Sequence, residues 1–348
     1  MKYPLLDTLH DFVREGMCTR RRHPEHPIWI YNYSQKAQFE FSAESWPEAL
    51  RDARGLVLDE DGHIVARGLK KFFNLSQLVT PPSGPAEFYE KADGSLILLF
   101  SYDGRRVVST RGAFDSPQSL WASEVIAEKY GELVPPSGVT YCLEAIYPGN
   151  RIVVDYGGLS ELVLLAAIDA STGADADHAL TELQGHFRSA RFYGALPPEE
   201  IPAVEGEGFV LRWSDGTRAK VKLDEYVRMH RMIYGTSSKT VWAMLRAGER
   251  PEASTPGLPL AIVEWVARCA QELRGRFDQR RRVFEARYAE AVGRGITQAT
   301  RAEFAEWAKT QEHAKVYFML LDGKAIDDLL WRMIEPEFYR PKWAEELE

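Results

Sequence analysis

The order of strand and helix patterns constrains the fold of this 348-residue chain more than any other feature of its sequence. Up to about residue 230, short apolar segments of strand length alternate with turn residues. The clearest pair is Leu96–Phe100 and Arg106–Thr110, and the Asp103-Gly104 turn between them is typical of a β-hairpin. Further strands are expected at 55–58, 141–146, 151–155, 162–167, 208–212 and 219–222, and helices at 116–130 and 177–190. We therefore expect an α+β domain of mainly antiparallel sheets with flanking helices.

Beyond residue 230 the strand pattern fades and helical spacing takes over. After a stretch rich in proline and glycine at 250–257, apolar residues recur at steps of three and four and form one stripe: Ile262, Val266, Cys269, Leu273 and Phe277. Two more helices are expected within 304–321 and 326–333. We expect the domain limits at 1–235 and 236–348, with an all-helical second domain.

Composition narrows the class of protein. The formal net charge is -8, which argues against binding nucleic acid through bulk charge but leaves room for a local basic groove. The three cysteines, Cys18, Cys142 and Cys269, are far apart and indicate a reducing cytoplasm without a disulfide framework or a cysteine zinc site. We expect no signal peptide and no membrane span, hence a cytoplasmic protein.

The segment Lys91-Ala92-Asp93-Gly94 precedes an apolar strand and carries the strongest chemical signal. A lysine beside a carboxylate on a tight turn can be a covalent nucleophile if its surroundings favour the neutral amine. The same four residues also suit an ordinary hairpin turn with a solvated lysine, so the accompanying residues must decide.

Charged groups at four other places match this chemistry. Arg54 and Lys71 offer cations to a polyphosphate, and Glu144 lies in an otherwise apolar strand. Glu207 precedes another strand. Lys220 and Lys222 stand two residues apart, so they point to the same face of a strand and favour an anion between them.

Taken in order, these motifs resemble those of the covalent nucleotidyltransferase superfamily, which contains ATP-dependent ligases and mRNA capping enzymes. The matching segments are Lys91–Gly94, Glu144, Glu207–Val210 and Lys220–Lys222. More narrowly, the chain resembles the RNA ligase 1 family typified by the T-even phage enzyme, through Arg54-Gly55, Lys71–Asn74 and Asn150–Val153. The resemblance covers roughly residues 30–235. It implies an ATP-grasp-like nucleotidyltransferase domain followed by an all-helical domain.

The resemblance also implies a three-step reaction. Lys91 would attack the α-phosphorus of ATP and become a lysyl-adenylate, AMP would pass to the 5′-phosphate of an RNA, and a 3′-hydroxyl would displace it. The implied substrate is RNA with these two ends, in this family often broken tRNA, and an end-healing kinase or phosphatase is an expected partner.

Further roles follow from the resemblance alone. Glu207 and Asp93 would act through Mg²⁺ or Mn²⁺ and its waters. Glu144 would accept hydrogen bonds from the ribose. Lys220 and Lys222 would hold the α-phosphate. For each of these residues a structural role stays open: an ion pair for Glu207, a satisfied buried carboxyl for Glu144, and protection of an edge strand for the two lysines.

The remaining expected ATP-binding residues are Arg54, Lys71, Phe73, Gly94, Arg111, Phe209 and Tyr33. Arg54 and Lys71 would orient the leaving pyrophosphate, with solvated surface charge as the alternative. Phe73 and Phe209 would line the nucleotide pocket or pack in the core. Arg111 stands where the family has a lysine, and Tyr33 corresponds loosely to a family tyrosine.

Two arginine-rich segments remain open between RNA contact and a solvated surface. One is Arg20-Arg21-Arg22, and the other is the helical stretch with Arg274, Arg276, Arg280, Arg281, Arg282 and Arg287. The helical tail argues against DNA ligases and capping enzymes, in which a β-rich domain follows. The alternatives to an RNA ligase are a DNA ligase of the same superfamily and a non-catalytic relative that binds RNA.

Overall fold

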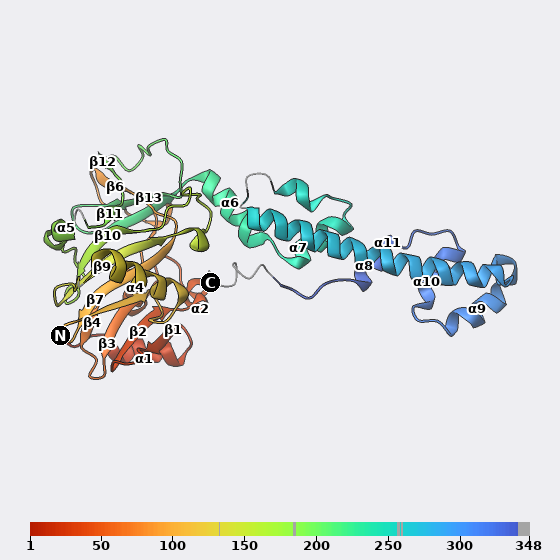
Figure 1. Cartoon of the computed structure of the whole chain (residues 1–348), viewed down its shortest axis with the longest axis horizontal. Helices are drawn as coiled ribbons and strands as arrows, with labels where there is room; N and C mark the ends of the chain where they lie inside the picture. Colours follow the sequence, from red (N-terminus) through yellow and green to blue (C-terminus); the bar gives the residue numbers. More distant parts are fainter. Residues whose placement is uncertain (132, 184–185, 256–257, 259, 340–348) are drawn as a thin grey trace. The chain divides into compact units, whose positions relative to one another are not determined.

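The computed structural model describes residues 1–131, 133–183, 186–255, 258 and 260–339. The chain forms two compact units, Met1–Val227 and Arg228–Glu348, and each is described on its own (Figure 1). The boundary falls inside helix α6 (Asp224–Gly235), a few residues before the expected domain limit. The assignment of an adenylyltransferase domain to 1–235 stays a prediction.

The first unit contains three sheets. The first sheet is antiparallel and runs in the order β1 (Cys18–Arg22), β2 (Ile28–Tyr33), β3 (Arg54–Asp59) and β4 (Ile64–Ala66). Three helices accompany it: α1 (Leu6–Arg14), α2 (Gln35–Glu40) and α3 (Glu48–Asp52). Leu9 of α1 packs with Tyr31 and Tyr33 of β2 in one buried cluster, so α1 covers that face of the sheet.

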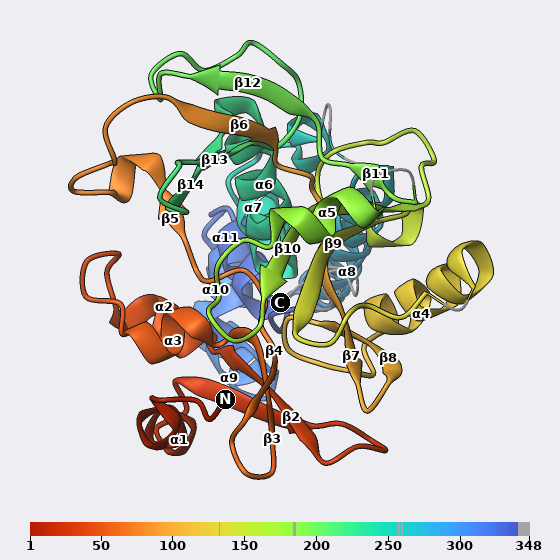
Figure 2. The same cartoon turned by 90° about the vertical axis from the view of Figure 1, so that its left-hand side faces the viewer.

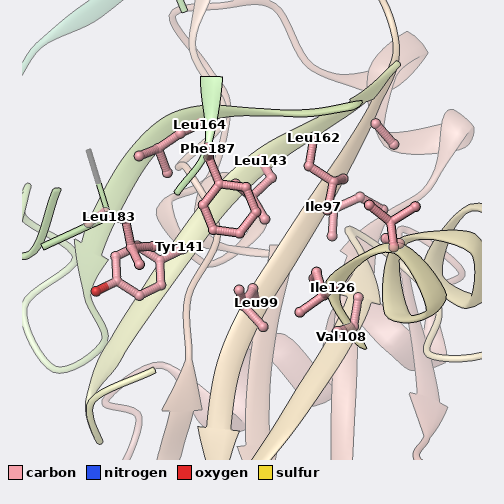
Figure 3. Packing of buried hydrophobic residues seen from close by; sticks show 14 of the residues in the cluster. Ile97, Leu99, Val108, Ile126, Tyr141, Leu143, Leu162, Leu164, Leu183 and Phe187 are labelled. Atoms are coloured by element: carbon pink, nitrogen blue, oxygen red, sulfur yellow. The ribbon is translucent and has the colours of Figure 1, made fainter. Parts of the chain in front are cut away.

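The second sheet forms the centre of the unit. Its order is β11 (Arg188–Ser189), β10 (Glu161–Asp169), β9 (Val139–Ile146), β7 (Ser95–Tyr102) and β8 (Arg105–Thr110), antiparallel apart from the β10–β11 pair. Helices α4 (Pro117–Tyr130) and α5 (Asp177–Leu183) pack on it. Figure 3 shows the core between them, where Ile97, Leu143 and Leu162 of three neighbouring strands meet Ile126 of α4.

The third sheet carries most of the expected site residues. It runs β12 (Phe192–Leu196), β6 (Ala86–Glu90), β13 (Gly208–Arg212), β14 (Arg218–Lys222) and β5 (Phe73–Asn74), antiparallel apart from β14–β5. Figure 2 shows the first and third sheets at opposite ends of the unit, with β9 and β10 between them. Since β6 runs directly into β7, the Lys91–Gly94 turn links the third sheet to the second.

The α+β class and the mainly antiparallel pairing are confirmed. The expected hairpin is β7–β8, and its turn residues Asp103 and Gly104 have φ of 50° and 70°, as a tight two-residue hairpin turn requires. Two expectations were wrong. Residues 151–155 form no strand, because the N–H groups of Val153 and Val154 bond to the Asp93 side chain instead of a neighbouring strand. The helix expected at 177–190 ends at Leu183, and Arg188 and Ser189 form β11; residues 184–185 lie outside the described part.

The described part of the second unit is helical, as the sequence predicted. After α6 come α7 (Ser238–Arg246), α8 (Leu260–Gly293), α9 (Arg301–Lys309), α10 (Ala314–Leu321) and α11 (Asp327–Met333), with short 3₁₀ turns at Pro251–Ser254 and Gln298–Thr300. The predicted stripe on α8 is buried from Ile262 to Leu273. Across the described residues, none of the helices combines the length and apolarity that a bilayer span requires.

Candidate active site

Lys91 is held between two sheets by its backbone and its side chain. Its N–H donates to the carbonyl of Gly208 (2.9 Å), and its Nζ lies 2.6 Å from Oε2 of Glu207. The other oxygen of Glu207 lies 2.8 Å from Nζ of Lys222, because Lys222 faces Gly208 across the β13–β14 ladder. Glu207 therefore forms a carboxylate bridge between two ammonium groups, and its side chain is only 3% exposed.

Glycine at position 208 is required for this approach. Its φ is 141°, a conformation that side chains disfavour, and a Cβ there would lie 2.0 Å from the carbonyl oxygen of Val221. The absence of a side chain lets β13 start next to β14 while Glu207 turns toward both lysines. The Glu207-Gly208 pair is thus a geometric requirement of the bridge.

The charges of the bridge decide the ionisation of Glu207. Burial by itself raises the pKa of this carboxyl, but Lys91 and Lys222 outweigh burial and bring the pKa below its ordinary value. Glu207 is therefore an ionised carboxylate in a nearly dry place.

Whereas Glu207 has neighbours of opposite charge, Lys220 has neighbours of the same charge as its own. It lies on the same strand as Lys222, and none of the carboxylates in the described residues forms an ion pair with it. Burial and the nearby charges of Lys91 and Lys222 lower the pKa of Lys220 to about 7. A partly buried amine surrounded by cations is a place prepared for an anion.

Glu144 on β9 lies below the Lys91 turn. Its Oε1 accepts a hydrogen bond from the N–H of Gly94 (3.1 Å), and burial raises the pKa of this carboxyl to about 7, with Glu207 adding to the effect. A Cβ on Gly94 would lie 2.3 Å from the carbonyl oxygen of Ala145, so glycine is needed for the turn to rest on β9. At neutral pH Glu144 is poised between its two charge states.

Asp93 holds the turn from inside the protein. Its Oδ2 accepts from the N–H groups of Val153 (2.9 Å) and Val154 (2.8 Å), and its Oδ1 accepts from the hydroxyl of Tyr226 (2.7 Å). Its own N–H donates to the hydroxyl of Tyr156 (2.8 Å). Both carboxylate oxygens thus have protein donors, and the metal role expected for Asp93 stays a prediction.

Asn150 ties the same loop to the second sheet. Its Nδ2 donates to the carbonyl of Ala145 (2.8 Å), and its Oδ1 accepts from the hydroxyl of Ser95 (3.0 Å). The segment from Asn150 to Tyr156 therefore holds the Lys91–Gly94 turn at Asp93 and at the neighbouring Ser95. No role for Tyr156 or Tyr226 came from the sequence, since their partners are 63 and 133 residues away.

A second cationic cluster lies around Tyr33. Nζ of Lys71 stands 4.5 Å from the Tyr33 ring centre and 4.2 Å from that of Trp46, and Arg111 donates to the Tyr33 hydroxyl (3.3 Å). Burial lowers the pKa of Lys71. Burial alone raises the pKa of Tyr33, but the charges of Arg54, Arg111 and Lys71 bring it below its ordinary value.

The two clusters share one electrostatic field. The charges of Lys71 and Arg54 contribute to lowering the pKa of Lys220, and Arg54 also acts on Glu144. Arg54 itself donates to the carbonyl of Leu69 (3.2 Å). The structure thus brings together cations from four places that are distant in sequence.

The two expected phenylalanines are core residues. Phe209 is fully buried and packs edge to face against Phe88 and Tyr193. Phe73 is 8% exposed and packs against Trp46. Their contribution to a nucleotide pocket stays a prediction.

Comparison with known proteins finds similarity to RNA ligases. Residues 52–187 match a family model described as RNA ligase. A curated relative, the putative bifunctional polynucleotide kinase/RNA ligase of Autographa californica nuclear polyhedrosis virus, is 29% identical over 263 residues, which are 65% of this chain and 36% of the viral protein. The chain thus spans about a third of that relative's length.

Solved RNA ligase structures are also similar. An archaeal ATP-dependent RNA ligase covers 76% of this chain and 75% of its own length at 16% identity, with a TM-score of 0.45. A Naegleria gruberi RNA ligase with PPi covers 43% of this chain and 52% of its own length at 15% identity, with a TM-score of 0.36. A mutant of the same enzyme, with ATP and Mn, covers 42% of this chain and 52% of its own length at 14% identity, with a TM-score of 0.35.

The RNA ligase match ends before Phe209 and before three charged residues of the expected site. The matched range includes Arg54, Lys71, Lys91 and Glu144, whereas Glu207, Lys220 and Lys222 follow residue 187. The structure places the last three beside Lys91 through β13 and β14.

The structure shows acidic partners for some of the arginines of the helical unit. Arg274 donates to Glu252 (3.1 Å) and Arg281 pairs with Asp327, so these two arginines belong to charge-paired surface. Arg276, Arg280 and Arg282 are exposed.

The Gly235–Thr240 segment contains the cap of α7, where the Ser237 hydroxyl accepts a hydrogen bond from the N–H of Thr240.

Proposed function

We propose that this chain is an ATP-dependent RNA ligase that joins a 5′-phosphate to a 3′-hydroxyl through a lysyl-AMP and an RNA-adenylate. The observation that carries the proposal is the Lys91–Glu207–Lys222 bridge with the unpaired Lys220 beside it. A covalent nucleophile stands there with the cations that a transferring phosphoryl group needs. We assign residues 1–235 to adenylyl transfer and 236–348 to a helical accessory domain.

In the first step, the nitrogen of Lys91 bonds to the α-phosphorus of ATP. The bond from that phosphorus to the oxygen bridging to the β-phosphate breaks, and pyrophosphate leaves. Attack requires the unprotonated amine, so the Lys91–Glu207 ion pair must open and the amine must lose a proton first. Lys220 and Lys222 then face the charge that develops on the α-phosphate.

The second cluster suits the rest of the nucleotide. Arg54, Lys71 and Arg111 are assigned to the leaving pyrophosphate, with Tyr33 orienting Lys71 and Arg111 through its ring and hydroxyl. Glu144 is assigned to the ribose hydroxyls, which would donate hydrogen bonds to its ionised carboxylate. These assignments stand on cation placement and on the family resemblance.

Glu207 could hold a divalent cation once one of its two ion pairs opens, because its carboxylate oxygens contact the ammonium groups of Lys91 and Lys222. This carboxylate is ionised and buried, and Mg²⁺ or Mn²⁺ commonly binds one or two carboxylates together with phosphate oxygens and waters. When bound, the cation would neutralise phosphate charge and polarise the α-phosphorus. Engagement of the Glu207 carboxylate there would free the Lys91 amine from its ion pair.

Broken tRNA is the proposed natural substrate, on family resemblance. The viral relative's name joins a polynucleotide kinase to an RNA ligase, which supports a partner that prepares RNA ends for this chain. Adenylate would move from Lys91 to the RNA 5′-phosphate, and attack by the 3′-hydroxyl would release AMP and complete the phosphodiester.

The test is a sealing assay with a 5′-phosphorylated single-stranded RNA, ATP and Mg²⁺. We expect circular RNA, no product with Lys91→Ala, and full activity with Lys129→Ala, an exposed lysine outside the site. GTP and NAD should not replace ATP. Faster sealing of nicked DNA would favour the DNA ligase alternative, and RNA binding without any adenylate would favour a non-catalytic relative.

A further inference from the structure

Strand β1 presents an unusual edge to solvent. It is the outer strand of the first sheet and pairs only with β2 in the described residues. Cys18 is buried, whereas the four residues that follow it, Thr19 to Arg22, are all exposed. Three of these four are arginines, on a chain whose formal net charge is -8.

These arginines differ from others in the same unit in having no acidic partner. Within the described part of the chain, Arg20, Arg21 and Arg22 form no ion pair. By contrast, Arg67 pairs with Asp52, and Arg218 with Asp175. The two acidic residues of the nearby helix α1 interact with other residues. Asp11 forms an ion pair with Arg14, and the charge of Asp7 acts on the pKa of His10. Three unpaired guanidinium groups make a local positive surface.

The register divides the three arginines between two faces. Arg20 faces Tyr31 and Arg22 faces Trp29, so these two arginines share the aromatic face of the sheet, and Arg21 faces Ile30 on the other side. The Arg20 guanidinium carbon lies 4.6 Å from the Trp29 ring centre, and that of Arg22 lies 6.0 Å away. Stacking on one ring preorganises both guanidinium groups.

The same face of the sheet also carries a residue of the candidate active site. The next pair along the ladder is Cys18 and Tyr33, and the Tyr33 hydroxyl accepts from Arg111. A strand rises roughly 3.3 Å per residue, so Arg20 stands about 7 Å and Arg22 about 13 Å along the strand from that pair. The exposed part of this face ends at Arg20, because Cys18, Tyr31 and Tyr33 are buried in the cluster that α1 covers.

We propose that Arg20 and Arg22 of β1 bind the phosphate backbone of the single-stranded RNA substrate. The proposal rests on the proposed function. Two guanidinium groups about 7 Å apart suit an extended polyanion, and an aromatic ring between them suits bases. The rival explanation is that charge on an edge strand only prevents pairing between molecules.

The test compares variants with equal charge loss. RNA affinity is measured by fluorescence anisotropy of a labelled 5′-phosphorylated single-stranded RNA over a range of salt concentrations. We expect R20S/R22S to lose affinity about tenfold at low salt and to reduce the log–log salt slope by roughly 1.4, because two phosphate contacts disappear. R276S/R280S on α8 has the same charge loss at exposed positions and should stay within about twofold of wild type.

Arg21→Ser is the second control, since it removes one charge from the same strand on the opposite face and should change affinity less than Arg20→Ser. R20K/R22K keeps the charge and should retain most of the salt slope, even if R20S/R22S folds poorly. Equal affinity of all variants, a larger loss in the α8 variant, or no RNA binding by wild type would overturn the proposal. Formation of lysyl-AMP is scored separately: its absence in wild type overturns the proposed function, whereas RNA binding judges the β1 face.

Discussion

The substitution Lys220→Met should stabilise the ligand-free protein while abolishing adenylyl transfer. Lys220 is a partly buried amine with no carboxylate partner among the residues that the structure describes, and its pKa is lowered from the ordinary 10.5 to about 7. A change of that size corresponds to about 5 kcal/mol, since each tenfold change in proton affinity is worth roughly 1.4 kcal/mol. Because solvent reaches part of the side chain, we expect ~1–3 kcal/mol in the free energy of unfolding.

The gain should depend on pH. Below pH 7 the amine is protonated in both folded and unfolded chains, so the folded wild type carries the whole penalty. Between pH 7 and 10.5 the folded chain releases this proton while the unfolded chain keeps it, so wild-type stability rises with pH and the advantage of Lys220→Met shrinks. Urea unfolding at pH 6.5 and 9.5 measures both values.

Two matched variants separate the electrostatic cause from the added apolar side chain. Lys129→Met, at an exposed position, should leave stability nearly unchanged. Lys222→Met should destabilise, because the buried Glu207 carboxylate loses one of its two cations. Added ATP should stabilise wild type more than Lys220→Met, because Lys220 is assigned to the α-phosphate. The reasoning fails if Lys220→Met lowers stability at pH 6.5, or if its effect is the same at both pH values.

Three further predictions concern groups around Lys91. ATP affinity should peak near pH 7, because Glu144 must be ionised and Lys220 protonated, and both pKa values lie near 7. In fluorescence titrations, Glu144→Gln should weaken the loss of ATP affinity on the acid side of this profile. An unchanged profile would exclude Glu144 from nucleotide binding. Tyr156→Phe leaves the N–H of Asp93 without its acceptor. Single-turnover formation of lysyl-AMP should therefore slow by about tenfold or more, and the free energy of unfolding should fall by ~1–3 kcal/mol. An unchanged rate would show that Tyr156 does not position the turn. Gly208→Ala should destabilise by about 3 kcal/mol or more in urea unfolding, and a neutral effect would contradict the close approach of β13 to Val221.

Local patterns in the sequence predicted what depends on neighbouring residues. The apolar segments of β7 and β8 and the Asp103-Gly104 turn predicted the hairpin, and the three- and four-residue spacing predicted the buried stripe of α8. The two-residue step from Lys220 to Lys222 correctly put both side chains on one face. Such features follow from backbone periodicity, which a single sequence displays directly.

Long-range pairing could not be obtained in this way. The apolar segment at 151–155 has strand composition, but its backbone donors bind Asp93, some sixty residues earlier in the chain. Likewise, the sequence offered Glu207 as a carboxylate and Lys91 and Lys222 as cations without indicating that one bridges the other two. Tertiary structure decides these partners, so the sequence could name only the candidate residues, and the fold supplied the contacts among them.

The most direct measurement is peptide mapping of the protein after incubation with ATP and Mg²⁺ and removal of free nucleotide. Mass spectrometry should find AMP on the peptide containing Lys91, as an acid-labile adduct that is lost in Lys91→Ala and kept in Lys129→Ala. An adduct on any other lysine, or none in protein that binds ATP, would contradict the assignment of this amine as the group that carries the adenylate.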